Sequence, residues 1–148
     1  MEDKISSMER VVFTPIGYIE TSIKMGFGYD KSAKAVILNS YKIGLKGLEG
    51  FSHLIFVFYM HRVHHYELLQ RPLRHNPEGE VVGVFATRSP YRPNPIGVSV
   101  VKLISIENGS IVFENRDIID GTPLLDIKPY LPEDLSGLRT GWYVPKRP

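Results

Sequence analysis

The chain has 148 residues, of which 43% are hydrophobic and 23% charged, as in an ordinary globular protein of one domain. Its net charge of +2 is too small to indicate a nucleic-acid-binding protein by itself. The absence of cysteine excludes disulfides, thiolate metal sites and cysteine nucleophiles, and no apolar run has the length of a membrane span. The polar N-terminus does not resemble a signal peptide, so the chain is expected to be cytoplasmic and without a membrane partner.

Short apolar segments rich in β-branched and aromatic residues, separated by glycine and proline, extend over most of the chain. They predict strands over residues 11–21, 33–38, 51–60, 81–86, 98–106 and 111–114. Pro15 favours an edge position for the first of these strands. The segment FSHLIFVFYM favours a strand buried on both faces, with a buried helix as the alternative, and the 81–86 and 98–106 strands are also expected to be buried.

Glycine, proline and polar residues mark the connections between these strands. Loops, turns or short helices are expected over residues 24–34, 43–50 and 70–80. Residues 1–9 are expected to form a mobile tail ahead of a single domain of residues 10–148. The pair Asn108-Gly109 predicts a hairpin turn. Many short strands with little helical periodicity predict a mostly-β domain, either a barrel or a strongly curled sheet.

Two stretches suggest other functions but support them weakly. GFGYDK is only superficially similar to a dinucleotide-binding fingerprint, because Lys31 replaces the third glycine and no helix is expected after it. His61 and His65 would share one face of a helix, but Arg62 stands where a zinc protease needs glutamate and no third ligand lies nearby in sequence. No metal site is therefore expected, and the two histidines are assigned to hydrogen bonding or packing.

A polar loop stiffened by proline lies between two of the predicted strands, in the segment GVFATRSPYRPNPIGVSV. Its polar residues are Thr87, Arg88, Ser89, Tyr91, Arg92 and Asn94. Pro90, Pro93 and Pro95 each fix their own backbone and restrict the residue before them. Rigid polar loops on strands often hold binding or catalytic residues, with an elaborate turn and solvated arginines as the alternative.

A second dense stretch, RDIIDGTPLLDIKPYLP, covers residues 116–132. Asp117, Asp120 and Asp126 are interleaved with isoleucine and leucine, so their carboxylates are expected close to apolar walls. Asp120 with Gly121 also forms a plausible turn, and at this level a turn role and a functional role for Asp120 are equally open.

Four motifs of the chain resemble the TrmO family, also called the TsaA-like or YaeB family, in the family's order. They are PIGYIETS, GLEGFSHL, GVFATRSPYRPNPIG and DGTPLLDIKPYLP, and the resemblance covers nearly the whole chain. It implies an S-adenosylmethionine-dependent methyltransferase with a single curled β-barrel and a few short helices, unlike a Rossmann fold. It also implies a homodimer with a cofactor pocket near the subunit contact. The reaction implied is N6-methylation of threonylcarbamoyladenosine in the anticodon loop of tRNA.

The resemblance also carries over a set of cofactor contacts by position. They fall on His61, Arg62, Arg88, Val98, Asp117, Ile118, Ile119 and Asp120. The chain departs from the family at two places: Arg62 stands where relatives often have glutamine, and residues 25–31 replace a Pro-Arg-Gln segment. Longer relatives have an additional C-terminal region, so tRNA contacts made there are expected to be absent or replaced.

The implied reaction needs a general base, because the carbamoylated N6 is a poor nucleophile until its proton leaves. Asp120 is the first candidate and His61 the second. Equally open is that Asp117 or Asp120 binds the cofactor's amino group or ribose hydroxyls. Two alternative functions remain: methyl transfer to another substrate, and a non-catalytic module that binds S-adenosylmethionine or RNA.

The central polar loop supplies candidates for substrate binding. Arg88 and Arg92 suit an anion, either the cofactor carboxylate or an RNA phosphate, because a guanidinium binds oxyanions in a planar fork. Asn94 suits reading of an adenine edge or positioning of the carbamoyl oxygen, which also makes it a catalytic candidate. Tyr91 suits stacking on a base of the anticodon loop, the usual mode in which single-stranded RNA is held.

Overall fold

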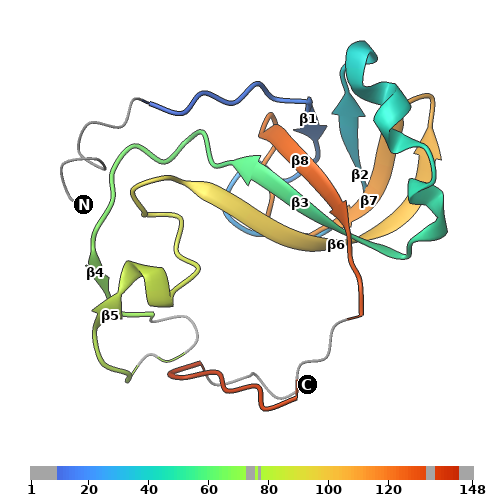
Figure 1. The fold of residues 1–148 in the computed structure, drawn as a ribbon. Helices are drawn as coiled ribbons and strands as arrows, with labels where there is room; N and C mark the ends of the chain where they lie inside the picture. The colour runs from blue at the N-terminus through green and yellow to red at the C-terminus, as the bar shows by residue number, and fades with distance from the viewer. Residues whose placement is uncertain (1–9, 73–75, 77, 133–135, 144–148) are drawn as a thin grey trace.

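The computed structural model describes residues 10–72, 76, 78–132 and 136–143. Six strands form a closed barrel in the order β1-β2-β7-β6-β3-β8, with every neighbouring pair antiparallel (Figure 1). They are β1 (Gly17–Glu20), β2 (Asp30–Ile37), β3 (His53–Tyr59), β6 (Ile96–Glu107), β7 (Ser110–Asn115) and β8 (Pro123–Pro129). The predicted mostly-β, barrel-like fold is confirmed, and it is not a Rossmann fold.

The remaining elements are short. The 3-10 helices η1 (Asn39–Leu45) and η2 (Leu48–Gly50) connect β2 to β3, as the turns or short helix predicted there. The strands β4 (Leu69–Gln70) and β5 (Val82–Gly83) form a small separate sheet, which Figure 1 shows apart from the barrel, and the 3-10 helix η3 (Val84–Ala86) follows it. The indole Nε1 of Trp142 donates to the carbonyl of Ala86 at 2.6 Å, so the C-terminal segment packs beside η3.

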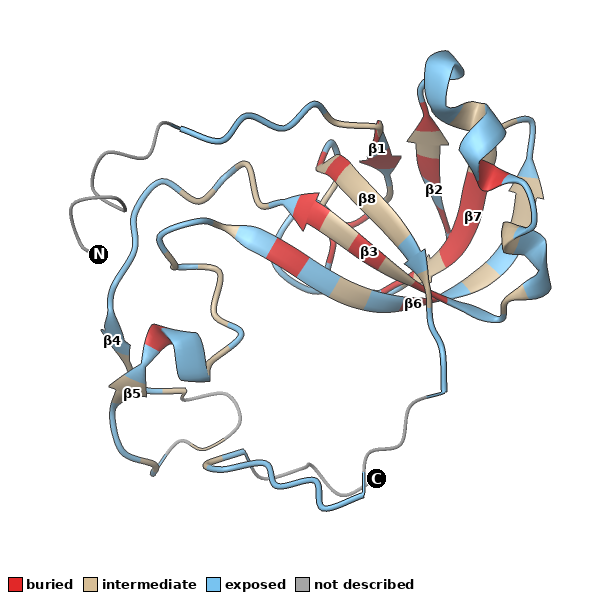
Figure 2. Ribbon diagram, in the orientation of Figure 1, coloured by how far each residue is buried: buried red, intermediate tan, exposed pale blue. Residues whose placement is uncertain are grey.

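Alternating side chains of the barrel strands fill its interior. Those that are almost completely buried include Ile19, Ala35, Leu54, Phe56, Ile111, Phe113 and Leu124. The rings of Phe56 and Phe113 meet edge to face with centroids 4.9 Å apart. Figure 2 shows buried positions repeating along the strands between less buried ones. This alternation leaves the opposite face of each strand on the outside of the barrel.

The hairpin turn is confirmed, but several predicted strands differ from the structure. Asn108 and Gly109 both have positive φ, at 51° and 77°, as the turn between β6 and β7 requires. Residues 81–86 are wrong as a buried strand, because only Val82–Gly83 pairs and Phe85 in η3 is exposed. The 11–21 strand is limited to β1, consistent with the missing N–H of Pro15.

Further differences follow from burial and register. The loop predicted over residues 24–34 ends earlier, because Asp30 already pairs with Asn115 across a bulge at the start of β2. The strand β3 is buried on one face and only half-buried on the other. Every second residue of β6 is exposed, so this strand is also buried on one face only.

Parts of three predictions lie outside the described residues: the tail of residues 1–9, the middle of the 70–80 loop, and the end of the single domain of residues 10–148. Among the described residues, no helix is long and apolar enough to cross a membrane.

Candidate functional site

Parts of three sequence motifs meet at one end of the barrel, whereas GLEGFSHL leads into β3 at the other end. At the first of these ends β3 and β1 end and β6 and β8 begin, as their antiparallel registers require. The amide of Met60, just after β3, donates to the carbonyl of Pro95, just before β6, at 2.8 Å. The amide of Asp120, ahead of β8, donates to the carbonyl of Ile23, beyond β1, at 2.8 Å. His61 Nε2 lies 4.0 Å from the point where a Cβ on Gly121 would stand, so the two halves adjoin.

Asn115 holds the turn of residues 116–121 in place. Its side chain is fully buried, and it donates through Nδ2 to the carbonyl of Ile118 at 2.7 Å and to Thr21 Oγ1 at 3.1 Å. Its Oδ1 accepts from the amide of Ile118 at 3.0 Å. The carbonyl of Ile119 accepts from the hydroxyl of Thr122 at 2.6 Å. This turn is therefore a rigid mount for the carboxylates on either side of Ile118 and Ile119.

Asp120 is held by a cation and by the backbone. Its Oδ2 accepts from Lys24 Nζ at 2.7 Å, and its Oδ1 accepts from the amide of Thr21 at 3.1 Å. The hydrogen bond from Lys24, then that from Thr21, and the nearby charge of Arg62 lower the pKa of Asp120. Arg62 Nη1 donates to the carbonyl of Lys24 at 3.3 Å. The carboxylate is thus ionised, already paired and weakly basic.

His61 is kept neutral by its surroundings. Burial lowers its pKa from the ordinary value of 6.5, and the positive charge of Arg62 and the neighbouring His64 lower it further. Its Nδ1 is buried and has no hydrogen-bond partner within the described part of the chain. Because no bond at Nδ1 fixes the tautomer, Nε2 is able to present either a lone pair or an N–H to a ligand.

A cavity of about 450 Å³, a size suited to a small-molecule ligand, reaches the turn of residues 116–121 at Arg116 and Asp117, and neither His61 nor Asp120 is among the residues that line it. Its lining includes Arg88 of the central loop, Val98 and Ser99 of β6, and Asp117. The hydroxyl of Ser99 donates to both carboxylate oxygens of Asp117, at 3.1 and 3.2 Å. Arg88 of the central loop and Asp117 of the turn of residues 116–121 therefore line the same cavity.

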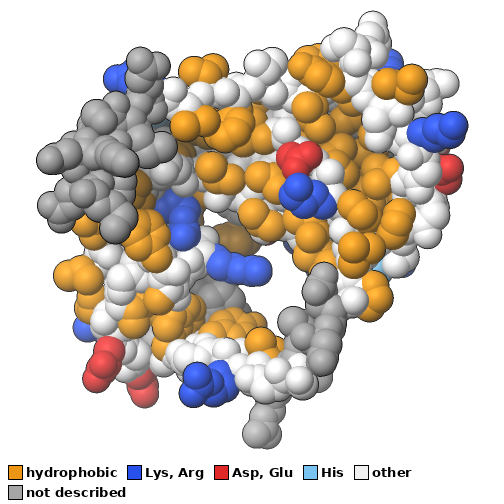
Figure 3. All heavy atoms as spheres, in the orientation of Figure 1, with side chains coloured by type: hydrophobic (Ala, Val, Ile, Leu, Met, Phe, Trp, Pro, Cys, Tyr) orange, Lys and Arg blue, Asp and Glu red, His pale blue; other side chains and the backbone are white. Residues whose placement is uncertain are grey.

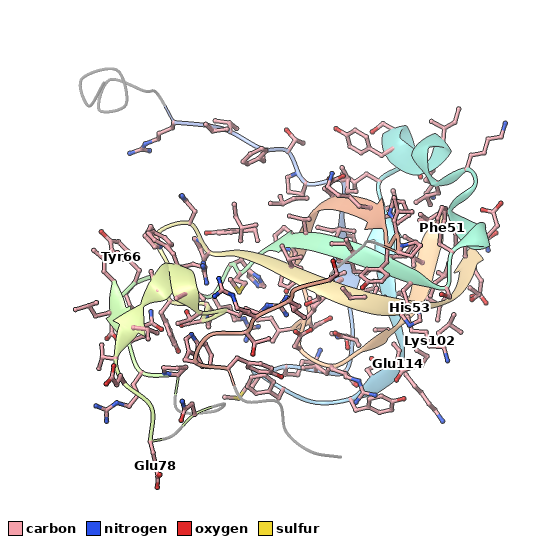
Figure 4. The ribbon with its side chains drawn as sticks, turned by 60° about the horizontal axis from the view of Figure 1, so that its bottom comes forward. Phe51, His53, Tyr66, Glu78, Lys102 and Glu114 are labelled. Atoms are coloured by element: carbon pink, nitrogen blue, oxygen red, sulfur yellow. The ribbon has the colours of Figure 1, made fainter. Side chains whose placement is uncertain are left out.

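The cavity continues over the outer face of three adjacent strands. His53, Lys102 and Glu114 line it and occupy neighbouring register positions on β3, β6 and β7. Figure 4 shows these three side chains close together on the barrel. The lining therefore mixes acidic and basic groups.

The rest of the central loop uses its polar groups largely to order itself. Arg92 Nη1 donates to the carbonyls of Thr87 and Ser89, at 3.0 and 2.9 Å. The ring of Tyr91 stacks on His65 with centroids 4.7 Å apart. Asn94 is exposed next to the Met60–Pro95 contact. None of Tyr91, Arg92 and Asn94 belongs to the residues that line the 450 Å³ cavity.

Sequence reasoning missed Lys24, Thr21, Asn115 and Ser99 as residues of the site. Thr21 carried a usable signal, since it lies in the PIGYIETS motif. Lys24 carried none, because its partner Asp120 is 96 positions away along the chain. Histidine, aspartate and glutamate side chains of the described residues form no group of three or more arranged to hold a metal ion.

Comparisons with known proteins point to one family. A family model described as the tRNA-methyltransferase O N-terminal domain matches residues 21–134. A probable S-adenosyl-L-methionine-binding protein of Pyrococcus abyssi is 40% identical over 142 residues, which are 89% of this chain and 76% of that protein. A tRNA (adenine(37)-N6)-methyltransferase of Mus musculus is 38% identical over 141 residues, 82% of this chain.

A crystal structure of TrmO from Pseudomonas aeruginosa is similar as a whole fold. It aligns with a TM-score of 0.73 and 32% identity over 93% of this chain. The chain spans 64% of the protein in that structure and 32% of the mouse relative.

Proposed function

Since the chain belongs to the TrmO family, whose N-terminal domain matches residues 21–134, we propose that it transfers a methyl group from S-adenosylmethionine to N6 of an adenine in tRNA. One observation carries this proposal: Arg88 of the central loop and Asp117 of the turn of residues 116–121 line one cavity together with Val98 of β6. The names of the Mus musculus and Pyrococcus abyssi relatives support the reaction and the cofactor, respectively.

The residues around the cavity fit S-adenosylmethionine in charge and size. The Arg88 guanidinium would bind the cofactor carboxylate, and Asp117 would accept from its amino group or ribose hydroxyls. Val98 supplies an apolar wall. The buried Nδ1 of His61, which has no partner among the described residues, is a polar group near the turn of residues 116–121 that a ligand is able to engage. When bound, the cofactor supplies a methyl group activated by its sulfonium.

Ile118 and Ile119 contribute differently from the charged residues. Ile118 is buried and both of its backbone groups bond to Asn115, so it positions Asp117 and Asp120 without a free polar group of its own. Ile119 is half-buried and its carbonyl accepts from Thr122. We therefore assign both residues to the mount of the site.

His61 is the better of the two candidates for the general base. Its ring is neutral at neutral pH, because its pKa lies below 6.5, and its Nε2 faces the turn at Gly121. Asp120 is already engaged by Lys24, so its carboxylate is less suited to accept a proton and more suited to bind and orient. In this assignment His61 accepts the N6 proton, while Asp120, Lys24 and Arg62 form the wall that positions the reactants.

The finer substrate assignment rests on the polar groups of the central loop. Figure 3 shows Lys and Arg side chains at the edge of an opening between the barrel and the small sheet, as binding of a polyanion such as tRNA requires. We assign Asn94 to the carbamoyl oxygen or adenine edge of threonylcarbamoyladenosine in the anticodon loop, and Tyr91 to an adjacent base. Arg92 supports both by ordering the loop between them.

We further propose a homodimer in the cytoplasm, with the cofactor pocket close to the subunit contact. The outward face of β6 supports this contact, since Val98 and Val100 are each 53% exposed and Ile104 is 50% exposed. Figure 3 shows hydrophobic side chains gathered over the barrel strands on one face of the molecule. Exposed apolar side chains of this kind, here with Lys102 between Val100 and Ile104, are often found at an interface between subunits.

The proposed reaction is tested with the purified chain, methyl-labelled S-adenosylmethionine and threonylcarbamoylated tRNA. We expect label on the modified adenine, identified by nucleoside mass spectrometry, and a strong loss of label with His61→Gln. Unmodified tRNA of the same sequence is the matched control. Transfer to unmodified RNA but not to the modified tRNA would contradict the threonylcarbamoyl assignment.

A second candidate function is a module that binds S-adenosylmethionine without turnover. It is favoured by the name of the Pyrococcus abyssi relative, which describes binding only, and by Arg62 in a position where the family often has glutamine. Cofactor affinity measured by calorimetry, with no transfer to a total tRNA pool, would support this function over methyl transfer.

A further inference from the structure

His61 and Arg62 are the two central residues of a tight turn that follows β3. The amide of Val63 donates to the carbonyl of Met60 at 3.2 Å, which closes this turn. The amide of Met60 is itself bonded to the carbonyl of Pro95, so the turn is fastened to the start of β6. Two neighbouring side chains, one able to accept a proton and one always charged, are therefore held at the same place on the barrel.

The side chain of Arg62 reaches the groups that surround Asp120. Its Nη1 donates to the carbonyl of Lys24 at 3.3 Å, and Lys24 Nζ is bonded to Asp120 Oδ2 at 2.7 Å. Burial, and then the charge of Arg62, lower the pKa of His61. The same charge adds to the bonds that lower the pKa of Asp120, among which the bond from Lys24 contributes most. The guanidinium therefore lies near both candidates for the general base.

The charges in this group are not balanced. Lys24 and Asp120 neutralise each other in their ion pair. Arg62 is exposed and forms no ion pair among the described residues, and its bond to the Lys24 carbonyl uses one of its five N–H donors. A guanidinium with donors left over, next to an imidazole that accepts a proton, suits an oxyanion, which it binds through a planar fork.

The substrate in the proposed function carries such an oxyanion a few bonds away from the reacting nitrogen. The threonyl group of threonylcarbamoyladenosine, joined to N6 through the carbamoyl group, has a free carboxylate, and unmodified adenine has none. We propose that Arg62 binds this threonyl carboxylate and thereby selects threonylcarbamoyladenosine over unmodified adenine. With N6 at His61, the short carbamoyl linker brings the carboxylate to the adjacent Arg62. This inference rests on the proposed function and deepens it by naming the residue that reads the modification.

The test measures binding of two anticodon stem-loop RNAs to the full chain in the presence of S-adenosylhomocysteine, so it needs no turnover. One RNA carries threonylcarbamoyladenosine, and the other carries the same group with a neutral carboxamide in place of the carboxylate. The unchanged chain should bind the carboxylate RNA about 10-fold more tightly, from the usual strength of a hydrogen bond to a charged group. Arg62→Ala should bind both RNAs equally.

Two further variants separate the charge of Arg62 from its bond to the Lys24 carbonyl. Arg62→Gln keeps a side-chain N–H donor without the charge, and it should lose the preference as Arg62→Ala does. Arg62→Lys keeps the charge without the planar fork, and it should retain part of the preference. Arg71→Ala is the matched control, because Arg71 is an exposed arginine directly after β4 and outside the turn of residues 60–63. It should leave the ratio of the two affinities unchanged.

Each of four results would overturn the proposal. Equal affinity of the unchanged chain for the two RNAs would show that the carboxylate is not bound. An unchanged preference in Arg62→Ala would assign the carboxylate to another group. An equal loss for both RNAs in Arg62→Gln would assign the guanidinium to an RNA phosphate or to the turn itself. A loss of S-adenosylhomocysteine affinity in Arg62→Gln would assign it to the cofactor.

These outcomes are separate from those of the proposed function. Absence of methyl transfer, with a carboxylate preference that still depends on Arg62, would remove the reaction and leave the inference. Methyl transfer to threonylcarbamoyladenosine with the same kcat/KM in Arg62→Gln as in the unchanged chain would remove the inference and leave the reaction.

Discussion

His61 and Asp120 are both titratable and lie at the same turn, but the fold surrounds them differently. The buried ring of His61 has a nitrogen without a partner in the described chain, whereas Asp120 has bonds from Lys24 and Thr21. Both pKa values are lowered, which makes His61 neutral and Asp120 charged at neutral pH. A neutral imidazole is able to accept a proton, and a paired carboxylate is suited to bind a ligand. Their different surroundings therefore favour His61 as the base and Asp120 as a binding group.

The pH dependence of the methyl-transfer step tests the role of His61. A base works only when unprotonated, so the rate should be constant above the pKa of His61 and fall below it. Because that pKa lies below 6.5, the midpoint of the acid limb should lie below pH 6.5. Single-turnover rates across this range measure the limb, and it should vanish in His61→Gln. An identical limb in the variant would assign the titration to another group.

Arg88 tests the cofactor pocket. Removing its guanidinium with Arg88→Ala should raise the Kd for S-adenosylmethionine about 10-fold to 100-fold, since a charge-assisted hydrogen bond contributes roughly 1.5–3 kcal/mol. Arg71→Ala removes an exposed arginine that does not line the cavity, and it should bind the cofactor as the unchanged chain does. Calorimetric titration measures both, and equal affinity in all three proteins would reject the role of Arg88.

Among the elements, the turn between β7 and β8 positions the carboxylates of the site. The buried side-chain amide of Asn115 holds this turn in place. Asn115 is fully buried and bonds both backbone groups of Ile118 as well as Thr21. Without this side chain both backbone groups of Ile118 would lose their partner, and the bond to Thr21 would be lost. The positions of Asp117 and Asp120 therefore depend on Asn115, although Asn115 neither lines the cavity nor bonds to Lys24.

Asn115→Ala should destabilise the fold and loosen the site together. Each buried polar group left without a partner costs about 1–3 kcal/mol, so the free energy of unfolding should fall by roughly 2–4 kcal/mol. Urea unfolding measures this loss, and cofactor affinity should fall with it. Asn39→Ala, at an exposed position in η1, is the control and should change neither. Full stability of Asn115→Ala would contradict the role of the buried amide.

The sequence predicted the elements whose pattern is local. The β-branched run of β3 and the Asn108-Gly109 turn carry their own signals, and both are confirmed. Two elements failed for physical reasons. β8 begins and ends with proline and includes Asp126, so its pattern did not predict a strand, although pairing with β1 and β3 makes it one. The apolar run of residues 81–86 has no barrel strand to pair with and turns into η3 instead.

For the site, the resemblance to the family predicted several residues at or near the cavity, but it did not predict the side chains and bonds that hold them in position. Arg88 and Asp117 do share one space, and His61 does adjoin the Asp120–Gly121 turn. The Lys24–Asp120 pair and the bonds from Arg92 to its own loop depend on tertiary placement, so no spacing in the sequence announces them. Roles of the individual residues stay predictions.

In the whole molecule, closure of the barrel determines where the loops that carry the candidate site residues are placed. Six strands pair around a closed core, and the described loops connect them at the ends of the barrel or extend toward the small β4–β5 sheet. Parts of three of the four motifs lie at the end where β3 ends and β6 begins. The outer face of β6 exposes Val98, Val100 and Ile104 beside Lys102, which fits a second copy of the chain.

The homodimer is tested by placing a charge on that face. Ile104→Glu should convert the dimer to a monomer in analytical ultracentrifugation, because a buried unpaired carboxylate opposes association. Ile43→Glu makes the same change at an exposed residue of η1 and should leave the mass unchanged. If Ile104→Glu sediments like the unchanged chain, the outer face of β6 is not the interface.

A crystal structure of the chain with S-adenosylhomocysteine, the product of methyl transfer, tests the central claim most directly. The claim is that one end of the barrel forms a single pocket for the methyl donor and its acceptor. The account predicts the product in the cavity, with its carboxylate on Arg88, its amino group or ribose near Asp117, and its sulfur open toward His61. Product bound at another surface, or in the cavity without contact to Arg88 and Asp117, would contradict it.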